Sequence, residues 1–347
     1  MRLLAGLFRL LVLLVLLAGV SVGVLGYYVY SQFREPGPQA RAGETTVFTL
    51  QKGSGLTQMA HDLERDWLVR DALVFRLGVM WEGKTGALKA GEYEIPTGAS
   101  PKQIMEIFVS GKSIVHKLTI AEGLTSAVVT DLVRRDPILV GELTLTPAEG
   151  VLLPETYVFQ RGTTRDQLVA QMQRDHAKTI DELWEKRQPG LPFTTKAEAV
   201  TLASIVEKET GIASERPHVA AVFINRLRKG MRLQSDPTII YGLTKGVPLG
   251  RGIRQSELEK ETPYNTYVIT GLPPTPIANP GRASIEAVLN PMDSNDLYFV
   301  ANGTGGHAFA ATEPEHQANV VRWRQIERQQ AQQAPSTPPP QPRPRPR

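Results

Sequence analysis

The sequence predicts an α+β protein that begins with a single transmembrane helix, continues through small β/α units and ends in a larger mixed α+β domain. Three features predict this order. Residues 10–30 form one uninterrupted apolar run. From residue 44 onward, alternating segments that favour strands are followed by segments with helical spacing. From residue 188 to 322, helical patterns are separated by loops rich in Asn, Gln, Asp and Tyr.

The apolar run at residues 10–30 is long enough to cross a bilayer, since a helix rises about 1.5 Å per residue and the hydrocarbon core is about 30 Å thick. Tyr27, Tyr28 and Tyr30 at its far end are typical of a membrane–water interface. A cleaved signal peptide is the alternative. The run is longer than a typical signal-peptide core, and bulky tyrosines stand where small residues are expected, so the pattern favours a permanent anchor.

The charges around this run predict its orientation. Arg2 and Arg9 lie before or at its start, so residues 1–9 are expected to stay in the cytoplasm. Everything after the span is then outside, as in a single-pass protein of the plasma (inner) membrane. Residues 31–43 are rich in Pro, Gly and Ala, and they are predicted to be a linker that spaces the first folded unit from the bilayer.

Composition argues against several kinds of chemistry. The chain contains no Cys, which removes disulfides, thiol nucleophiles and Cys-bound metals. The six His show no close ligand spacing such as HExxH, so neither a metal nor another cofactor is expected. The net charge of +4 arises from interspersed basic and acidic residues without a basic stripe, which argues against nucleic acid as a partner.

Two related β/α units are predicted between the linker and the last domain, at residues 44–112 and 113–187. They repeat short motifs at matching places: Gly55-Leu56-Thr57 with Gly123-Leu124-Thr125, and Tyr93 with Tyr157. Chance matching of turn residues is the alternative explanation. The second unit is expected to pack on the domain at residues 188–322.

A well-delimited helix is predicted near the start of the domain at residues 188–322. Thr195, or alternatively Thr194, is placed to cap its N-terminus, and Glu198 stands in the capping-box position for Thr195. After the domain, residues 323–347 end in a segment of Gln, Ala, Pro and Arg, and they are predicted to be a disordered tail.

Two acids near the end of this helix are candidates for chemistry, and the helical register separates them. Three apolar residues precede Glu209 by seven, four and three positions: Leu202, Ile205 and Val206. Glu209 therefore projects from the apolar stripe, whereas Glu207 falls about 160° away and is expected to face water. A carboxyl against apolar side chains has a raised pKa, as a general acid near neutral pH requires. The alternative is that Glu-Lys-Glu simply ends an amphipathic helix in solvent.

Four segments together resemble the YceG-like family of endolytic murein transglycosylases. They are SIVEKET at Ser204–Thr210, and the segments Ser214–Gly242, Tyr264–Gly281 and Leu297–Thr312. The resemblance covers residues from about 44 to 321 and is most specific in the last third. It implies an anchor, a LysM-like region and a catalytic domain, in that order. Small strand–helix–helix–strand units such as the first one resemble LysM modules, which bind N-acetylated glycans.

The resemblance also implies site residues. The catalytic acid of the family is the second Glu of the EKET motif, which is Glu209 here and agrees with the helical-face argument. The matched polar residues are implied to line the substrate cleft: Asn225, Gln234, Asp236, Tyr241, Tyr264, Asn265 and Asn279. The chain departs from the usual pattern with Thr275 where Gly is frequent and Glu155 where Asp is usual.

The activity implied by the resemblance is that of a lytic transglycosylase, a carbon–oxygen lyase that cuts nascent peptidoglycan strands between MurNAc and GlcNAc. The cut leaves 1,6-anhydro-MurNAc ends and terminates strand elongation. The expected partners are peptidoglycan glycan strands, the membrane and the peptidoglycan synthases (penicillin-binding proteins). Two alternatives remain open. One is a muramidase with Glu207, Glu215 or Asp236 as second carboxylate, and the other is a non-catalytic glycan-binding scaffold of the synthesis machinery.

Overall fold

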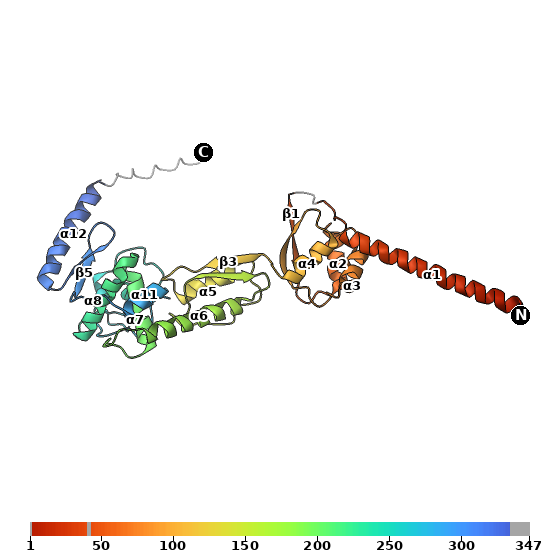
Figure 1. The fold of residues 1–347 in the computed structure, drawn as a ribbon. Helices are drawn as coiled ribbons and strands as arrows, with labels where there is room; N and C mark the ends of the chain where they lie inside the picture. The colour runs from red at the N-terminus through yellow and green to blue at the C-terminus, as the bar shows by residue number, and fades with distance from the viewer. Residues whose placement is uncertain (1, 40–42, 334–347) are drawn as a thin grey trace, which may run out of the picture. The chain divides into compact units, whose positions relative to one another are not determined.

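The computed structural model describes residues 2–39 and 43–333, which form two compact units. Unit 1 consists of Met1–Lys117, Pro137–Val140 and Val158–Thr164, and unit 2 consists of Leu118–Asp136, Gly141–Tyr157 and the chain from Arg165 onward. Within the described residues, helices are combined with three two-stranded sheets, β1-β2, β3-β4 and β5-β6 (Figure 1). The predicted α+β class is therefore confirmed.

Unit 1 follows the predicted order of strands and helices. Its elements are α1 (Arg2–Arg34), β1 (Thr45–Leu50), α2 (Leu56–Arg65), α3 (Ala72–Trp81), β2 (Gly91–Pro96) and α4 (Pro101–Ser110), with β3 (Val115–Thr119) leaving it. β1 and β2 are antiparallel, with Thr45 opposite Pro96 and Leu50 opposite Gly91. Apolar side chains from the sheet and from α2, α3 and α4 form one core beneath the strands.

Helix α1 contains one apolar stretch long enough to cross a membrane, Gly6–Arg34. The helix continues past the predicted end of the span, and the structure differs here from the predicted linker at residues 31–43. Phe33 is 3% exposed and belongs to the core of unit 1, and the Gly37 backbone N–H donates to the Gly98 carbonyl. Burial of the Phe33 ring offsets the cost of ordering this segment. Residues 40–42 of the predicted linker lie outside the described residues.

The two predicted repeats share local geometry. The Gly-Leu-Thr motifs stand at the starts of α2 and of α5 (Ser126–Arg135). Tyr93 in β2 and Tyr157 in β4 (Thr156–Gln160) are both buried, and each hydroxyl donates to the carbonyl four residues earlier, at 2.7 Å. The second copy lacks a counterpart of α3, since the described segment between α5 and β4 contains no helix.

Unit 2 is mainly helical. After α5 and β4 it contains α6 (Arg165–Glu185), α7 (Lys196–Glu209), the 3-10 turn η1 (Ala213–Glu215), α8 (Arg216–Arg228), α9 (Asp236–Thr244), α10 (Gln255–Leu258), α11 (Arg282–Leu289), β5 (Tyr298–Ala301), β6 (His307–Ala310) and α12 (Glu313–Gln333). Helix α11 packs on α7 and α8 (Figure 1). Ile180 and Leu183 of α6 belong to the same core. This arrangement places α7 in the centre of the unit.

The C-terminal part of unit 2 differs from the predicted tail at residues 323–347. Helix α12 extends to Gln333 and packs on β5 and β6. Its Gln, Glu, Arg and Ala residues are good helix formers, and after Pro314 in its first turn the next proline is Pro335. A composition that is typical of a disordered segment is therefore also compatible with an exposed helix that packs against the rest of the protein on one face only. Residues 334–347 lie outside the described part of the chain.

Candidate active site

Helix α7 carries the proposed acid at its last residue. Its N-terminus has the predicted capping box: the Thr195 hydroxyl accepts from the Glu198 N–H, and the Glu198 carboxylate accepts from the Thr195 N–H at 2.9 Å. Residues 199–206 are all buried in the core of unit 2. Because the N-terminus of α7 is capped and its middle is buried, the C-terminal end of the helix, and with it Glu209, has a fixed position.

Glu209 has the environment of a general acid. It borders a cavity and stays partly exposed there, while the surrounding protein removes most of the water from its carboxyl. The pKa of Glu209 is raised to about 7, mainly by this burial. The hydrogen bond from Ser235 and the charge of Arg226 act against the rise, and the nearby Asp236 carboxylate adds to it. Its place at the C-terminus of α7 also disfavours a negative charge.

Ser235 is the closest partner of Glu209. Its hydroxyl donates to Glu209 Oε1 at 2.5 Å. Ser235 precedes α9 in the N-cap position, but its side chain makes no cap hydrogen bond and is used by Glu209 instead. Two fully buried threonines hold it: its N–H donates to Thr266 Oγ1 at 2.9 Å, and its carbonyl accepts from Thr238 Oγ1 at 2.6 Å.

Arg226 supplies a buried positive charge near Glu209. Only 7% of the residue is exposed. Its guanidinium is fixed by backbone carbonyls, with Nε donating to Leu297 at 2.6 Å and Nη1 to Leu233 at 2.7 Å. Burial lowers the pKa of Arg226, and the neighbouring Tyr298, Tyr267 and Glu209 act in the opposite direction. A guanidinium remains charged at any physiological pH, so it stabilises Glu209 whenever the carboxyl loses its proton.

The cavity beside Glu209 has a volume of about 350 Å³. One wall is the end of α7 and the turn after it, with Glu209, Thr210 and Gly211. The facing walls come from the β5–β6 hairpin and from α12: Ala301, Gly303, Gly305, Gly306, His307, Trp323 and Gln330. Close packing explains one glycine, since a Cβ on Gly303 would stand 2.7 Å from Ile326 of α12.

His307 and Glu215 form a polar pair at this cavity. His307 Nδ1 lies 2.8 Å from Glu215 Oε2, and the His307 N–H donates to Glu215 Oε1 at 2.9 Å. Burial alone would raise the pKa of Glu215, but the hydrogen bonds from His307 outweigh it and the pKa is lowered. Glu215 is therefore a carboxylate at neutral pH, which places the proton on Nδ1 and leaves Nε2 for another partner.

The expectation that Glu207 faces water is wrong. Its side chain is 5% exposed. The carboxylate accepts from the Gly281 N–H at 2.9 Å and the Ser284 hydroxyl at 2.7 Å, and it pairs with Arg216 at 3.3 Å. Helical register alone overlooked the start of α11, which covers this face of α7. Glu207 ties the N-terminus of α11 to α7.

Two of the seven predicted cleft residues lie near Glu209. Asp236 accepts a hydrogen bond from the Tyr267 hydroxyl at 2.7 Å and is close enough to raise the pKa of Glu209. Gln234, exposed and with a left-handed φ of 53°, accepts from Arg226 Nη1 at 3.3 Å. Both flank Ser235.

Tyr241 and Tyr264 belong to a separate cluster. Their ring centroids are 5.0 Å apart, and the Lys245 ammonium lies over both rings. The Tyr241 hydroxyl donates to Glu149 Oε2 at 3.2 Å, and burial raises the pKa of Glu149. The Tyr264 hydroxyl is 2.8 Å from Thr275 Oγ1, so Thr275, one of the two expected departures from the family pattern, contacts a predicted cleft residue.

The three predicted asparagines hold backbone segments together. Asn225 donates to the carbonyls of Ser294 and Asp296, and the buried Asn265 donates to three carbonyls between residues 257 and 260. Asn279, with no exposed surface, donates to the Leu124 carbonyl at 3.0 Å and accepts from the Leu152 N–H at 2.9 Å. Their amides are occupied inside the protein, away from the cavity of Glu209.

Sequence reasoning missed most of the residues that surround Glu209. The sequence pattern gives no site role to Ser235, Arg226 or His307, and Trp323 lies in the segment predicted to be a disordered tail. A faint signal exists for three of them, since Arg226, Ser235 and His307 lie in segments that resemble the family, beside other polar positions.

A carboxyl with a pKa of about 7, a buried serine donor, a buried guanidinium and an adjoining cavity are the features that general acid–base catalysis requires. The chain belongs to the YceG-like family, whose model matches residues 48–322.

Two relatives are similar over most of the chain. The endolytic murein transglycosylase of Bacillus subtilis (strain 168) is 30% identical over 312 residues, which cover 80% of this chain and 85% of that protein. The protein of the same name from Streptococcus pneumoniae serotype 2 (strain D39) is 28% identical over 358 residues, covering 89% of this chain and 64% of the pneumococcal protein. A crystal structure of a putative yceG-like protein from Listeria monocytogenes is 32% identical and covers 80% of this chain and 99% of that one, with a TM-score of 0.48.

Proposed function

We propose that the chain is an endolytic peptidoglycan lytic transglycosylase in which Glu209 is the catalytic acid and base. The observation that carries this proposal is the carboxyl of Glu209, at the edge of a cavity, with its pKa raised to about 7. The family match and the relatives named endolytic murein transglycosylases support the same activity.

In the proposed reaction, protonated Glu209 donates its proton to the glycosidic oxygen between MurNAc and GlcNAc as the C1–O bond breaks. Positive charge develops at C1, and the carboxylate that remains is stabilised by Ser235 and Arg226. The carboxylate then removes the proton of the MurNAc C6 hydroxyl, whose oxygen bonds to C1. The products are a free GlcNAc hydroxyl and a 1,6-anhydro-MurNAc end, and no water is consumed.

The engagement of the other acids supports a mechanism with one carboxyl. Glu207 binds Arg216 and the start of α11, and Glu215 binds His307. Asp236 is exposed and electrostatically coupled to Glu209, which makes it the candidate base if the enzyme instead used water as a muramidase. The product mass separates the two reactions, because an anhydro end is one water lighter.

The N-terminal part of the chain supports action at the membrane. We infer that α1 anchors the protein in the plasma membrane with residues 1–9 in the cytoplasm, and that the enzyme cuts strands as the synthases release them. The strand–helix–helix–strand order of β1, α2, α3 and β2 supports glycan binding by unit 1. This binding would keep a nascent strand near the catalytic unit.

The proposal is tested by digesting uncrosslinked glycan strands with the wild type and with Glu209→Gln, and reading the products by mass spectrometry. The amide is nearly isosteric but does not donate a proton with comparable ease, so we expect loss of activity by at least about 100-fold with the fold intact. The matched control is Glu185→Gln, an exposed glutamate at the end of α6, which should cut normally. Full cleavage by Glu209→Gln would end the proposal, and products without anhydro ends would favour the muramidase.

A further inference from the structure

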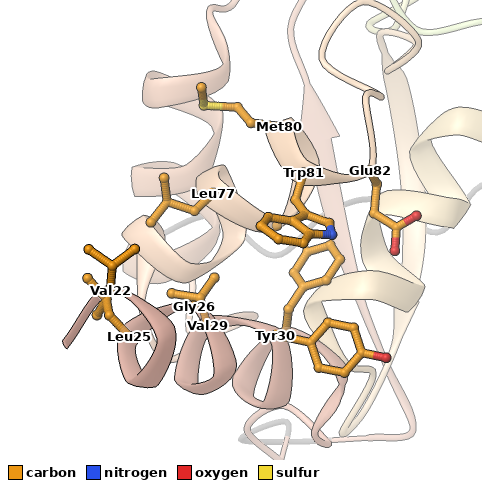
Figure 2. A pocket seen from close by; sticks show the side chains of 11 residues that line it. Val22, Leu25, Gly26, Val29, Tyr30, Leu77, Met80, Trp81 and Glu82 are labelled. Carbon is orange, nitrogen blue, oxygen red and sulfur yellow. The ribbon is translucent and has the colours of Figure 1, made fainter. Parts of the chain in front are cut away.

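An apolar groove of about 430 Å³ lies in unit 1 between the C-terminal half of α1 and the end of α3. Figure 2 shows the side chains that line it: Val22, Leu25, Val29 and Tyr30 from α1, Leu77, Met80 and Trp81 from α3, and Glu82 just after α3. The first folded unit therefore shares a surface with the helix proposed to span the membrane.

The junction between α1 and α3 is fixed by close packing. Phe33 of α1 is buried against α3 at Gly78, where a Cβ would stand only 2.1 Å from the ring. Only a glycine at position 78 lets the ring approach so closely. Because α1 cannot separate from α3 without exposing Phe33, the packing fixes the position of α3 along the axis of α1.

Helix geometry gives the depth of the groove along α1. Val22 precedes Tyr30 by eight residues, which is about 12 Å at 1.5 Å per residue. The tyrosines at the end of the span mark the interface, and half of a hydrocarbon core is about 15 Å deep. When α1 spans a bilayer, the groove between Val22 and Tyr30 lies at the depth of the acyl chains of one leaflet.

The α3 side of the groove suits this depth. Trp81 is 81% exposed and Met80 is 56% exposed, although both are large and apolar. On α1, Val22 and Leu25 are similarly exposed, so the apolar surface continues from one helix to the other. Such a continuous apolar surface is unfavourable in water and marks a contact with lipid or protein.

Charged groups stand at one end of the groove. Arg34 lies 3.8 Å from Glu82 and stacks over the Tyr30 ring at 4.3 Å, and Lys102 is 4.0 Å from Glu82. Where acyl chains meet phosphate headgroups, Trp and Tyr side chains usually lie on the acyl-chain side and Arg and Lys side chains on the headgroup side. The groove has the same order. This polarity distinguishes a lipid contact from a protein contact, which has no reason to place its cations at the headgroup level.

We propose that the end of α3 is a second membrane contact, with Leu77, Met80 and Trp81 embedded in the outer leaflet and acyl chains of that leaflet filling the groove. The inference rests on the proposed insertion of α1. It replaces the expected spacer between bilayer and first unit with a unit that sits in the membrane surface. Unit 1 would then receive strands at the level of the headgroups.

The absence of Cys allows the full-length protein to be labelled at single introduced cysteines. Nitroxide labels are placed by Met80→Cys in the groove, Leu73→Cys at the opposite end of α3, and Val15→Cys in the middle of the span. Leu73 is 51% exposed and is the matched control on the same helix. In vesicles of phosphatidylethanolamine and phosphatidylglycerol, collision with oxygen reports lipid and collision with a water-soluble nickel chelate reports water.

We expect the labels at positions 80 and 15 to collide with oxygen and to be shielded from nickel, and the label at position 73 to show the reverse. If position 15 is in lipid while position 80 is open to nickel, the inference is overturned and the anchor stands. If position 80 is shielded from both reagents, a second copy of the chain covers the groove and the inference also fails. If position 15 itself is open to nickel, membrane anchoring fails, independently of whether Glu209 cuts glycan.

Discussion

At the scale of single residues, the proposed mechanism depends on a balance around one carboxyl. Burial raises the pKa of Glu209, whereas Ser235 and Arg226 lower it. If burial acted without Ser235 and Arg226, Glu209 would hold its proton too tightly and would be a poor acid. If Ser235 and Arg226 acted without burial, Glu209 would be an ordinary carboxylate with no proton to donate at neutral pH. The result is a pKa of about 7, which allows the same group to act first as acid and then as base.

Ser235→Ala tests this balance through pH. The proposed reaction needs protonated Glu209, so wild-type activity should fall as pH rises above about 7. Removing a donor to the carboxylate disfavours the charged form, so the pKa rises and the alkaline limb of kcat/KM should move up by about one unit. The exposed Ser256→Ala is the control and should leave the profile unchanged. A limb that stays in place, or moves down, would show that Ser235 does not act on Glu209.

His307 is the second residue whose role is testable at this scale. Its Nδ1 is held by Glu215, so Nε2 is available to a sugar in the cavity. We expect His307→Ala to lower kcat/KM by about 10- to 100-fold. The loss should include a lower kcat, while the melting temperature changes little. His61→Ala, an exposed histidine in unit 1, is the control. Glu215→Gln should reproduce part of the loss, and wild-type kinetics in both variants would remove the pair from the site.

At the scale of elements, the cavity is assembled from segments that are distant in sequence. α7 brings Glu209, the turn before α9 brings Ser235, and α8 brings Arg226. The β5–β6 hairpin and α12 complete the opposite wall. α12 therefore forms part of the wall of the candidate site, although its composition is typical of a disordered tail.

Truncation measures the contribution of α12. A chain that ends at Arg322 lacks Trp323 and Gln330 and exposes the hairpin, so we expect a KM at least several-fold higher and a lower melting temperature. A chain that ends at Gln333 keeps the whole helix and should behave as the full-length protein. Trp323→Ala in the intact chain separates the two effects, since it removes the cavity side chain but keeps the helix. If both truncated chains are equally active, Trp323 and Gln330 do not belong to the site.

At the scale of the whole molecule, α1 is both the proposed anchor and part of a folded unit. Phe33 belongs to the core of unit 1 together with Phe75 and Val79 of α3. An enzyme held by an integral junction of this kind has unit 1 at a fixed distance from the bilayer. The proposed site of action, on strands that emerge at the membrane surface, is consistent with that constraint.

A pair of soluble chains tests the junction. A chain that starts at residue 31 keeps Phe33, whereas one that starts at residue 44 loses it. Since removal of a buried Phe costs about 3–5 kcal/mol, unit 1 of the shorter chain should unfold at a much lower urea concentration. Phe33→Ala in the longer chain should show a similar loss. Hydrogen exchange of the β1 and β2 amides is the measurement, and equal protection in all three chains would mean that residues 31–43 are a linker after all.

The sequence by itself determined the features that depend on local pattern. The apolar run, the capping box of Thr195 and Glu198, the order of strands and helices in unit 1 and the choice of Glu209 all follow from neighbours in the chain. Periodicity and capping are short-range properties, so they can be read without knowing the fold. The segments that resemble the family added the expected activity.

Only the tertiary structure decided which side chains meet. In the fold, the Ser235 hydroxyl binds Glu209 instead of capping α9, and the start of α11 covers Glu207. The side chains of Asn265 and Asn279 bind backbone groups inside the protein. It also folded residues 323–333 onto the hairpin and Phe33 into a core. The physical reason is that hydrogen bonding and burial depend on partners brought in from distant parts of the chain, and a residue's own sequence neighbourhood carries no record of them.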